Sequence, residues 1–186
     1  MHERNHRLTL LARVVGTLQE AGAAHALIGA AALAGRGVSR STQDVDLLVV
    51  DPRCLSVRFW EGLKREGASV DVRRGDDDDP LAGVVAFAAE GERPVDLVVG
   101  KRAWQGALLT RAEPSRFSGV LLPVVRTADL VLLKLFAGGP QDAWDIAELL
   151  AVSDRPALKA EVESRLAELP APAGTLWRKI EGESGS

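Results

Sequence analysis

Two aspartates at the start of an apolar stretch constrain this chain more than any other feature. Residues 45–50 read Val-Asp-Leu-Leu-Val-Val, between a Ser-Thr-Gln turn and Asp51-Pro52. This pattern predicts a buried strand. Because residues two apart on a strand point to the same face, Asp44 and Asp46 are expected to project together. Like charges held this close repel unless a cation lies between them, so the pair indicates a metal site. Mg²⁺, which binds carboxylates together with substrate phosphates, suits it.

A third acid stands in a similar setting further along the chain. Residues 83–89 and 95–99 predict an antiparallel hairpin, and Asp96 lies inside its second, otherwise apolar strand. A carboxylate there needs a metal, an arginine or water at a sheet end. Taken alone, Asp96 fits a structural role as well as a functional one. Its Val-Asp-Leu setting repeats that of Asp46, which favours the functional interpretation.

A glycine turn precedes the acidic pair. Residues 25–28 predict a short strand, and Gly29 followed by residues 30–33 predicts a tight turn into a short helix. Backbone N–H groups at a helix start bind phosphate, although an ordinary strand-to-helix turn has the same pattern. The polar loop that follows contains Arg36 and Arg40. Each arginine either neutralises Asp44 or holds a substrate phosphate.

Lys134 is the single cation in an apolar helix predicted over residues 128–137. It must reach solvent, pair with an acid or contact a ligand anion. Asp142 and Asp145 lie three apart on one face of the next predicted helix and offer such a pair. Pairing and a phosphate-binding or catalytic role both stay open. The four consecutive aspartates at 76–79 lack the spacing of a calcium loop and are interpreted as solvated.

Several other elements are predicted from periodicity and turn residues. They are helices around residues 8–21, 53–66, 103–111, 140–151 and 157–169, and strands at 68–73 and 119–125, the latter placed at an edge or strand end by Pro123.

Composition narrows the class of protein. The 186 residues fit one domain with at most a small helical appendage. With 26 acidic against 23 basic side chains and a net charge of -3, the chain is not expected to coat nucleic acid by bulk charge. The single cysteine, Cys54, excludes an internal disulfide framework and a cysteine-based metal cluster. Neither a signal peptide nor a membrane span is indicated, so a cytoplasmic location without membrane contact is expected.

Together, Gly29, Asp44-Val-Asp46 and Asp96 resemble the nucleotidyltransferase-fold superfamily. Residues 39–49, Ser-Arg-Ser-Thr-Gln-Asp-Val-Asp-Leu-Leu-Val, and the block at 129–146 look like its small bacterial branch related to AbiEii-type toxins. The resemblance implies an α+β fold, a nucleotidyltransferase-like mixed β-sheet flanked by helices with a C-terminal helical segment. The expected division is an α/β core at 1–125, a helical part of the same domain at 126–170 and a loosely ordered tail at 171–186.

The resemblance also implies an activity. The chain would transfer NMP from an NTP to a hydroxyl of RNA, a protein or a small molecule. The likeness to AbiEii-type toxins also implies, as one option, a toxin role with a cognate antitoxin as partner. Asp44, Asp46 and Asp96 would hold two Mg²⁺ ions and, with Lys134, form the catalytic set. The implied nucleotide-binding residues are Gly29, Ala30, Arg36 and Arg40.

Two alternatives remain from the sequence. Ala30 stands where many members of the superfamily carry a second Gly or Ser, so the chain lacks a hydroxyl near the triphosphate. This favours a nucleotide-binding or partner-binding module that has the fold with weak or no catalysis. A metal-dependent phosphohydrolase shares the acids but lacks a histidine-rich metal set, since His2, His6 and His25 all precede the acids.

Overall fold

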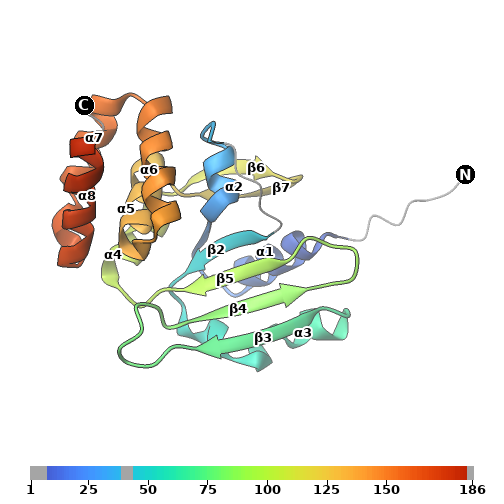
Figure 1. The fold of residues 1–186 in the computed structure, drawn as a ribbon. Coiled ribbons are helices and arrows are strands. Elements are labelled where there is room, and N and C mark those ends of the chain that lie inside the picture. Colours follow the sequence, from blue (N-terminus) through green and yellow to red (C-terminus); the bar gives the residue numbers. More distant parts are fainter. Residues whose placement is uncertain (1–7, 39–43, 184–186) are drawn as a thin grey trace, which may run out of the picture.

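A mixed β-sheet forms the middle of the computed structural model, which describes residues 8–38 and 44–183 (Figure 1). The strand order is β3-β4-β5-β2-β1-β7-β6. The strands span β1 His25–Ile28, β2 Val45–Val49, β3 Ser69–Arg74, β4 Gly83–Ala88, β5 Val95–Val99, β6 Glu113–Phe117 and β7 Val120–Val124.

The pairing of the central strands sets the position of the acids. β2 and β5 run parallel, and each is flanked by an antiparallel neighbour, β1 beside β2 and β4 beside β5. The expected hairpin of β4 and β5 is therefore confirmed. β1 also pairs with β7 in parallel, and β7 pairs with β6 in antiparallel. The neighbours β2 and β5 thus begin at the same edge of the sheet.

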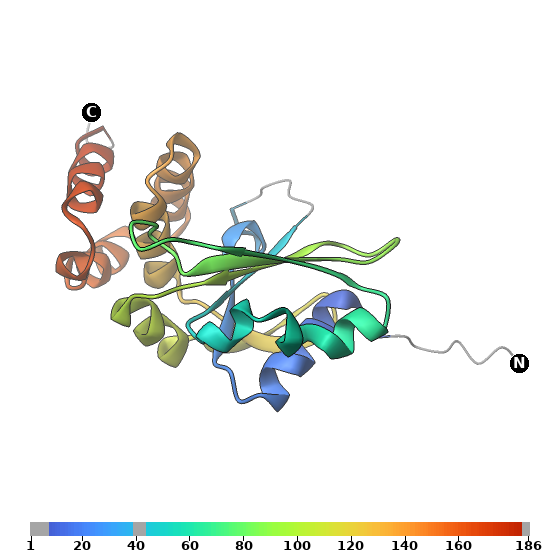
Figure 2. The ribbon, with the colours of Figure 1, turned by 90° about the horizontal axis from the view of Figure 1, so that it is seen from below.

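One face of the sheet is covered by the amino-terminal half of the chain. Helix α1 (Leu10–Glu20), the 3₁₀ turns η1 (Pro52–Leu55) and η2 (Val57–Trp60), and α3 (Glu61–Arg65) lie on this side (Figure 2). Val85, Leu97 and Leu47 from β4, β5 and β2 are fully buried beneath them. Burial of alternate residues on β4 and β5 leaves the other set of side chains only partly covered. The opposite face is therefore the more open one.

The carboxyl-terminal helices gather beside the sheet around α5 (Figure 1). They are α5 Thr127–Ala137, α6 Pro140–Val152, α7 Arg155–Glu163, the 3₁₀ turn η3 Leu166–Glu168 and α8 Ala171–Glu183. Asp129 of α5 is fully buried and lies 2.7 Å from Arg111 Nη2, at the end of α4 (Ala103–Arg111), and 2.8 Å from Arg165 Nη1. This ion pair network joins α4, α5 and the segment after α7.

The structure differs from several predicted elements. The helix expected over residues 53–66 is broken into η1, η2 and α3, with extended backbone at Ser56. Here Trp60 Nε1 donates to the carbonyl of Cys54, and the Trp60 ring packs against Phe87. The last predicted helix ends at Glu163 instead of residue 169.

Two further differences concern the sheet edge and the tail. β6 was not predicted because its residues are nearly all exposed and show no apolar alternation. It makes β7 an inner strand, so Pro123 is not at an edge. We expected a loose tail from residue 171, but α8 forms there because Ala173, Trp177 and Ile180 are buried against the other helices. Among the described helices, none has both the length and the apolar composition that crossing a membrane requires.

Candidate active site

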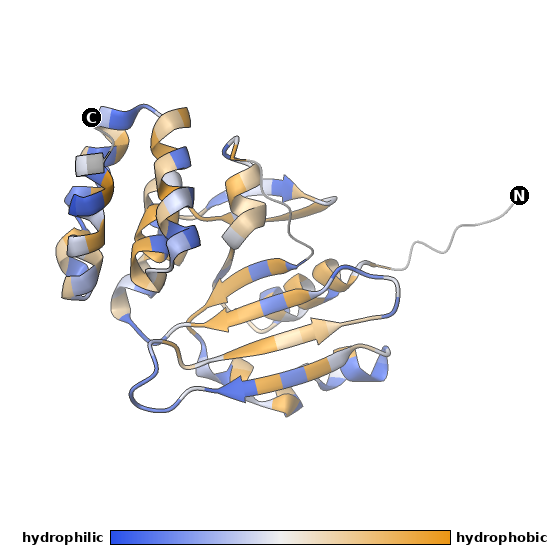
Figure 3. Ribbon diagram, viewed as in Figure 1, coloured by the Kyte–Doolittle hydropathy of each residue, from blue (hydrophilic) through white to orange (hydrophobic). Residues whose placement is uncertain are grey.

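The predicted acids meet on the more open face of the sheet. Asp46 on β2 lies directly opposite Asp96 on β5 in the parallel register. Both are half-buried, whereas the residues on either side of them in each strand are buried. Opposed residues on neighbouring strands share a face, and such strands lie about 4.8 Å apart. Hydrophilic bands accordingly interrupt the apolar strands β2 and β5 side by side (Figure 3).

Asp44 belongs to the same electrostatic group. It is exposed and precedes the first residue of β2. Burial raises the pKa of the Asp96 carboxyl, the negative charge of Asp44 raises it further, and the positive charge of Arg73 opposes both. Asp44 is therefore near enough to act on Asp96. Like charges crowd at this edge of the sheet, which is the condition that a bound cation relieves.

The donor set suits Mg²⁺, because carboxylate oxygens are the hard ligands that this ion prefers. Nevertheless, over residues 8–38 and 44–183 no three Asp, Glu, His or Cys side chains converge as a formed metal site. The backbone thus brings the acids to one edge of one face, and their side chains would have to turn toward a shared cation.

Gly29 lies against Asp46. It is the first residue of helix α2 (Gly29–Ala34) and has φ of +65°, in the left-handed region that favours glycine. A Cβ on Gly29 would come 2.0 Å from Asp46 Oδ2 and 2.7 Å from Asp46 Cγ. Both the backbone conformation and the space beside Asp46 therefore require glycine. Ala30, the next residue, is buried, with 8% of its surface exposed.

A cavity of about 340 Å³ lies on the same sheet face, between the sheet and α5. We call it the sheet–α5 cavity. Leu48 and Val98, which line it, follow Asp46 and Asp96 by two positions and so share their face. The cavity therefore adjoins the acids. Its other lining residues are Ile28, Gly29, Pro80, Leu81, Gln105, Leu130, Leu133, Lys134, Phe136, Ala137 and Asp142.

Lys134 pairs with both acids of the next helix, which was one of the two roles that the sequence left open. Its Nζ lies 2.8 Å from Asp142 Oδ1 and 2.7 Å from Asp145 Oδ2. The Asp145 side chain is fully buried and that of Lys134 is 13% exposed. Lys134 also lines the sheet–α5 cavity, so its ammonium group stands between a buried acid and the space beside the sheet.

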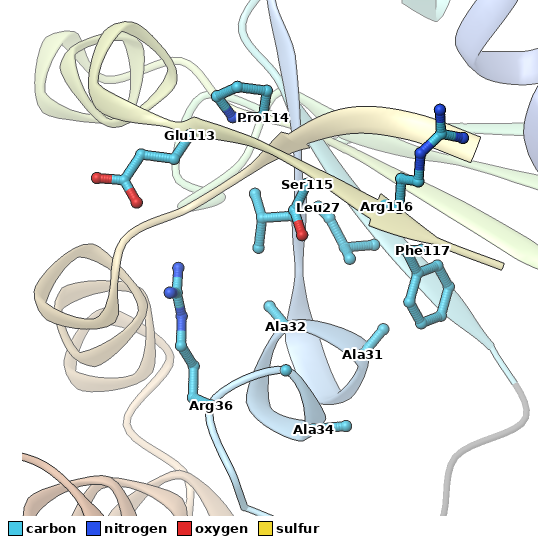
Figure 4. A pocket seen from close by; sticks show the side chains of 12 residues that line it. Leu27, Ala31, Ala32, Ala34, Arg36, Glu113, Pro114, Ser115, Arg116 and Phe117 are labelled. Carbon is cyan, nitrogen blue, oxygen red and sulfur yellow. The ribbon is translucent and has the colours of Figure 1, made fainter. Parts of the chain in front are cut away.

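Arg36 lies elsewhere. It lines a second cavity, of about 300 Å³, between α2 and β6, whose lining residues include none of the three acids. Figure 4 shows its side chain extending toward Glu113, and its Nη2 donates to the carbonyl of Val125. The structure therefore does not bring Arg36 together with the acids. Arg40, the other predicted phosphate-binding arginine, lies outside the described residues.

Two residues near the acids were given no role from the sequence. The positive charge of Arg73, on β3 and two strands away, lowers the pKa of Asp96. This proximity follows from the strand order and could not be inferred from the sequence. Gln105 is a fully buried residue on the wall of the sheet–α5 cavity. A glutamine in the first turn of a helix is common, so the sequence contained no signal for it.

The mixed seven-stranded sheet with flanking helices and a carboxyl-terminal helical segment is a nucleotidyltransferase-like α+β fold. The chain is similar to the solution structure of the antibiotic-resistance factor ANT(2'')-Ia, with a TM-score of 0.55 and 12% identity over 95% of each chain. The crystal structure of ANT(2'')-Ia with adenylyl-2''-tobramycin has a TM-score of 0.56 and 13% identity, covering 85% of this chain and 95% of that one. An antigenic nucleotidyltransferase-like protein from Paracoccidioides brasiliensis has a TM-score of 0.50 and 16% identity over 90% of each.

At these identities the likeness concerns the fold. No protein-family model and no curated protein matches the chain.

Proposed function

We propose that this protein is a nucleotidyltransferase that moves NMP from an NTP to a hydroxyl acceptor. The observation that carries the proposal is the register of Asp46 against Asp96 beside the sheet–α5 cavity. Two opposed carboxylates, a glycine that leaves room beside one of them and an adjoining cavity are what an NTP and its cations require.

The residues have separate tasks in this reaction. The NTP occupies the sheet–α5 cavity, with its triphosphate beside Gly29, whose missing side chain leaves room for the Asp46 carboxylate. Asp44, Asp46 and Asp96 would hold two Mg²⁺ ions, which when bound neutralise phosphate charge and polarise the α-phosphate. In the transfer, the acceptor oxygen bonds to the α-phosphorus as the bond from that phosphorus to the β-phosphate oxygen breaks. The proton of the hydroxyl passes to Asp96, and pyrophosphate leaves.

Asp96 is placed to accept that proton, because it lines a further cavity of about 270 Å³, next to Arg73 and Arg74. This cavity lies toward β3, on the side of Asp96 away from β2, and we assign it to the acceptor.

The proposed acceptor is a molecule with a free hydroxyl group. The similarity to ANT(2'')-Ia, solved with an adenylylated aminoglycoside, favours a small molecule with hydroxyl groups. RNA and protein hydroxyls are further candidate acceptors, because the sequence resembles AbiEii-type toxins. The comparisons with solved structures do not show that branch. A toxin role would add a cognate antitoxin as partner.

The test is intact-mass analysis of total RNA, protein and aminoglycosides after incubation with mixed NTPs and Mg²⁺. We expect one acceptor to gain the mass of one NMP, with release of pyrophosphate. Asp46→Asn should reduce transfer roughly 100-fold or more, because it removes a metal ligand. The control is Asp77→Asn, in the exposed acidic loop, which should leave transfer unchanged. Transfer that survives Asp46→Asn would refute the assignment.

A second candidate is a nucleotide-binding or partner-binding module of the same fold. Ala30 favours it, because its buried methyl group supplies no hydroxyl to a triphosphate. This candidate would be supported if calorimetry shows that an NTP binds and no pyrophosphate is released in the presence of any tested acceptor. Pyrophosphate release that depends on Asp46 would exclude it.

A further inference from the structure

A buried amide stands in the wall of the sheet–α5 cavity. Gln105 of α4 is completely buried, and its Oε1 accepts hydrogen bonds from the backbone N–H groups of Lys101 and Arg102, each at 2.9 Å. Because an N–H can donate only to the oxygen of the amide, these two bonds fix which way the group is turned. The Nε2 end therefore points away from this backbone.

Part of this arrangement is explained by helix capping. Arg102 is the N-cap of α4, and a Gln three residues later that accepts from the N-cap N–H is one half of a capping box. Gly100 leaves room for the amide, since a Cβ there would come 2.6 Å from Gln105 Oε1. Capping accounts for the oxygen of the amide and leaves the nitrogen unexplained.

Gln105 Nε2 is buried and has no acceptor among the residues that the structure describes. The cavity beside it is lined mainly by apolar side chains, among them Leu48, Val98, Leu130 and Phe136. A buried donor without an acceptor is costly, and native proteins seldom retain one without a use. Inside an apolar wall, a fixed donor is the kind of group that orients a ligand.

We propose that Gln105 Nε2 recognises the nucleobase of the NTP by donating to a carbonyl oxygen or ring nitrogen on its edge. This rests on the proposed function, which places the triphosphate at the Gly29 end of the same cavity. The apolar wall suits the faces of a base, and the single fixed donor reads one acceptor position. Bases that present a hydrogen-bond donor at that position leave two donors facing each other and are rejected.

The sharpest variant is Gln105→Glu. The carboxylate keeps an oxygen for the N–H groups of Lys101 and Arg102, replaces the Nε2 donor with an acceptor and adds a negative charge. That charge acts on all four NTPs alike, so the loss of preference among them reports on the donor. We expect kcat/KM for the preferred NTP to fall about tenfold at pH 8, while that for the other three changes less, so that the preference is lost or reversed. Gln105→Met removes both the Oε1 acceptor and the Nε2 donor. It should likewise bring the kcat/KM values of the four NTPs closer together. Gln19→Met, on the exposed end of α1, is the control.

A structural defect would lower kcat/KM for all four NTPs by the same factor. Equal losses in both Gln105 variants, or an unchanged preference, would therefore overturn the proposal while leaving the transferase function intact.

A measurement without turnover separates the two proposals. In ¹⁵N-labelled protein, the side-chain amide signal of Gln105, assigned by its disappearance in Gln105→Met, should shift on addition of the preferred NTP. It should not shift with inorganic tripolyphosphate. Such a shift in a protein that transfers nothing would support base recognition and refute the transferase. Equal shifts with both compounds would refute base recognition.

Discussion

Gly29→Ala should damage both the fold and the acid pair, and its effect can be worked out from the structure. Alanine at φ +65° costs roughly 1–2 kcal/mol in the left-handed region. The added Cβ also lies 2.0 Å from Asp46 Oδ2, well inside contact distance. Because Asp46 is only half-buried, we add about 0.5–1.5 kcal/mol for a side chain forced off its rotamer. The total is about 1.5–3.5 kcal/mol.

Gly22 provides a matched control. It also has φ of +65°, but nothing lies within 4 Å of the position that its Cβ would take. Gly22→Ala should therefore cost only the conformational part, roughly 1–2 kcal/mol. Urea denaturation of both variants isolates the contact with Asp46 as the difference between them. At this chain length, the Gly29 variant should melt roughly 3–14 °C below wild type.

The same pair of variants tests the site. Because Gly29→Ala displaces Asp46, transfer should fall at least about tenfold in folded protein, since misplaced catalytic groups lose rate steeply. Gly22→Ala, at the end of α1, should retain wild-type transfer. Equal destabilisation by the two substitutions, or full activity in Gly29→Ala, would show that Gly29 does not position Asp46 as the structure indicates.

The remaining predictions concern charge. Asp96→Asn should raise the melting temperature of the metal-free protein at pH 7 while abolishing transfer, because a raised pKa means that ionising Asp96 costs the folded state more than the unfolded chain. This cost is absent below the ordinary pKa of 3.8, where both states are protonated, and grows as the pH rises toward the folded-state pKa. The two melting curves should therefore converge in acid, and a lower melting temperature for Asp96→Asn at pH 7 would contradict this account. In NMR titrations of the metal-free protein, Asp44→Asn should lower the pKa of Asp96 and Arg73→Gln should raise it; shifts of one sign in both variants would contradict the assigned causes. Asp129→Asn removes the buried charge shared by two arginines and should cost about 3–5 kcal/mol in urea denaturation, so a loss below 1 kcal/mol would show that the network does not hold the helices together.

The acids of the site could be predicted from the sequence because Asp46 and Asp96 each lie inside a short, apolar, β-branched segment, and Asp44 directly precedes one. Such segments have few alternatives to a buried strand, so the faces of Asp46 and Asp96 followed from the strand period. Their opposition depends on β2 and β5 being neighbours in parallel. This pairing joins residues about fifty positions apart, and no local pattern encodes it. The resemblance implied only that the three acids share a metal site, and the structure supplies the pairing.

Elements without an apolar pattern escaped prediction. β6 is nearly all exposed and is held by backbone bonds to β7, so its side chains contain little information about it. α8 begins inside a Pro-Ala-Pro-Ala-Gly stretch that is typical of a loose segment, yet Trp177 and Ile180 are buried against the other helices. In both places tertiary contacts decide the local structure, as is common where propensity is weak.

Lys134 shows why a structural and a functional role need not exclude each other. The sequence offered ion pairing or ligand contact as alternatives, and the structure shows the pairs with Asp142 and Asp145. An ammonium group has three hydrogens, and these two pairs use two of them. Because Lys134 also lines the sheet–α5 cavity, we propose that its third hydrogen contacts a phosphate of the NTP there. The two acids that anchor the lysine in one orientation would reduce the entropy that it loses on such a contact.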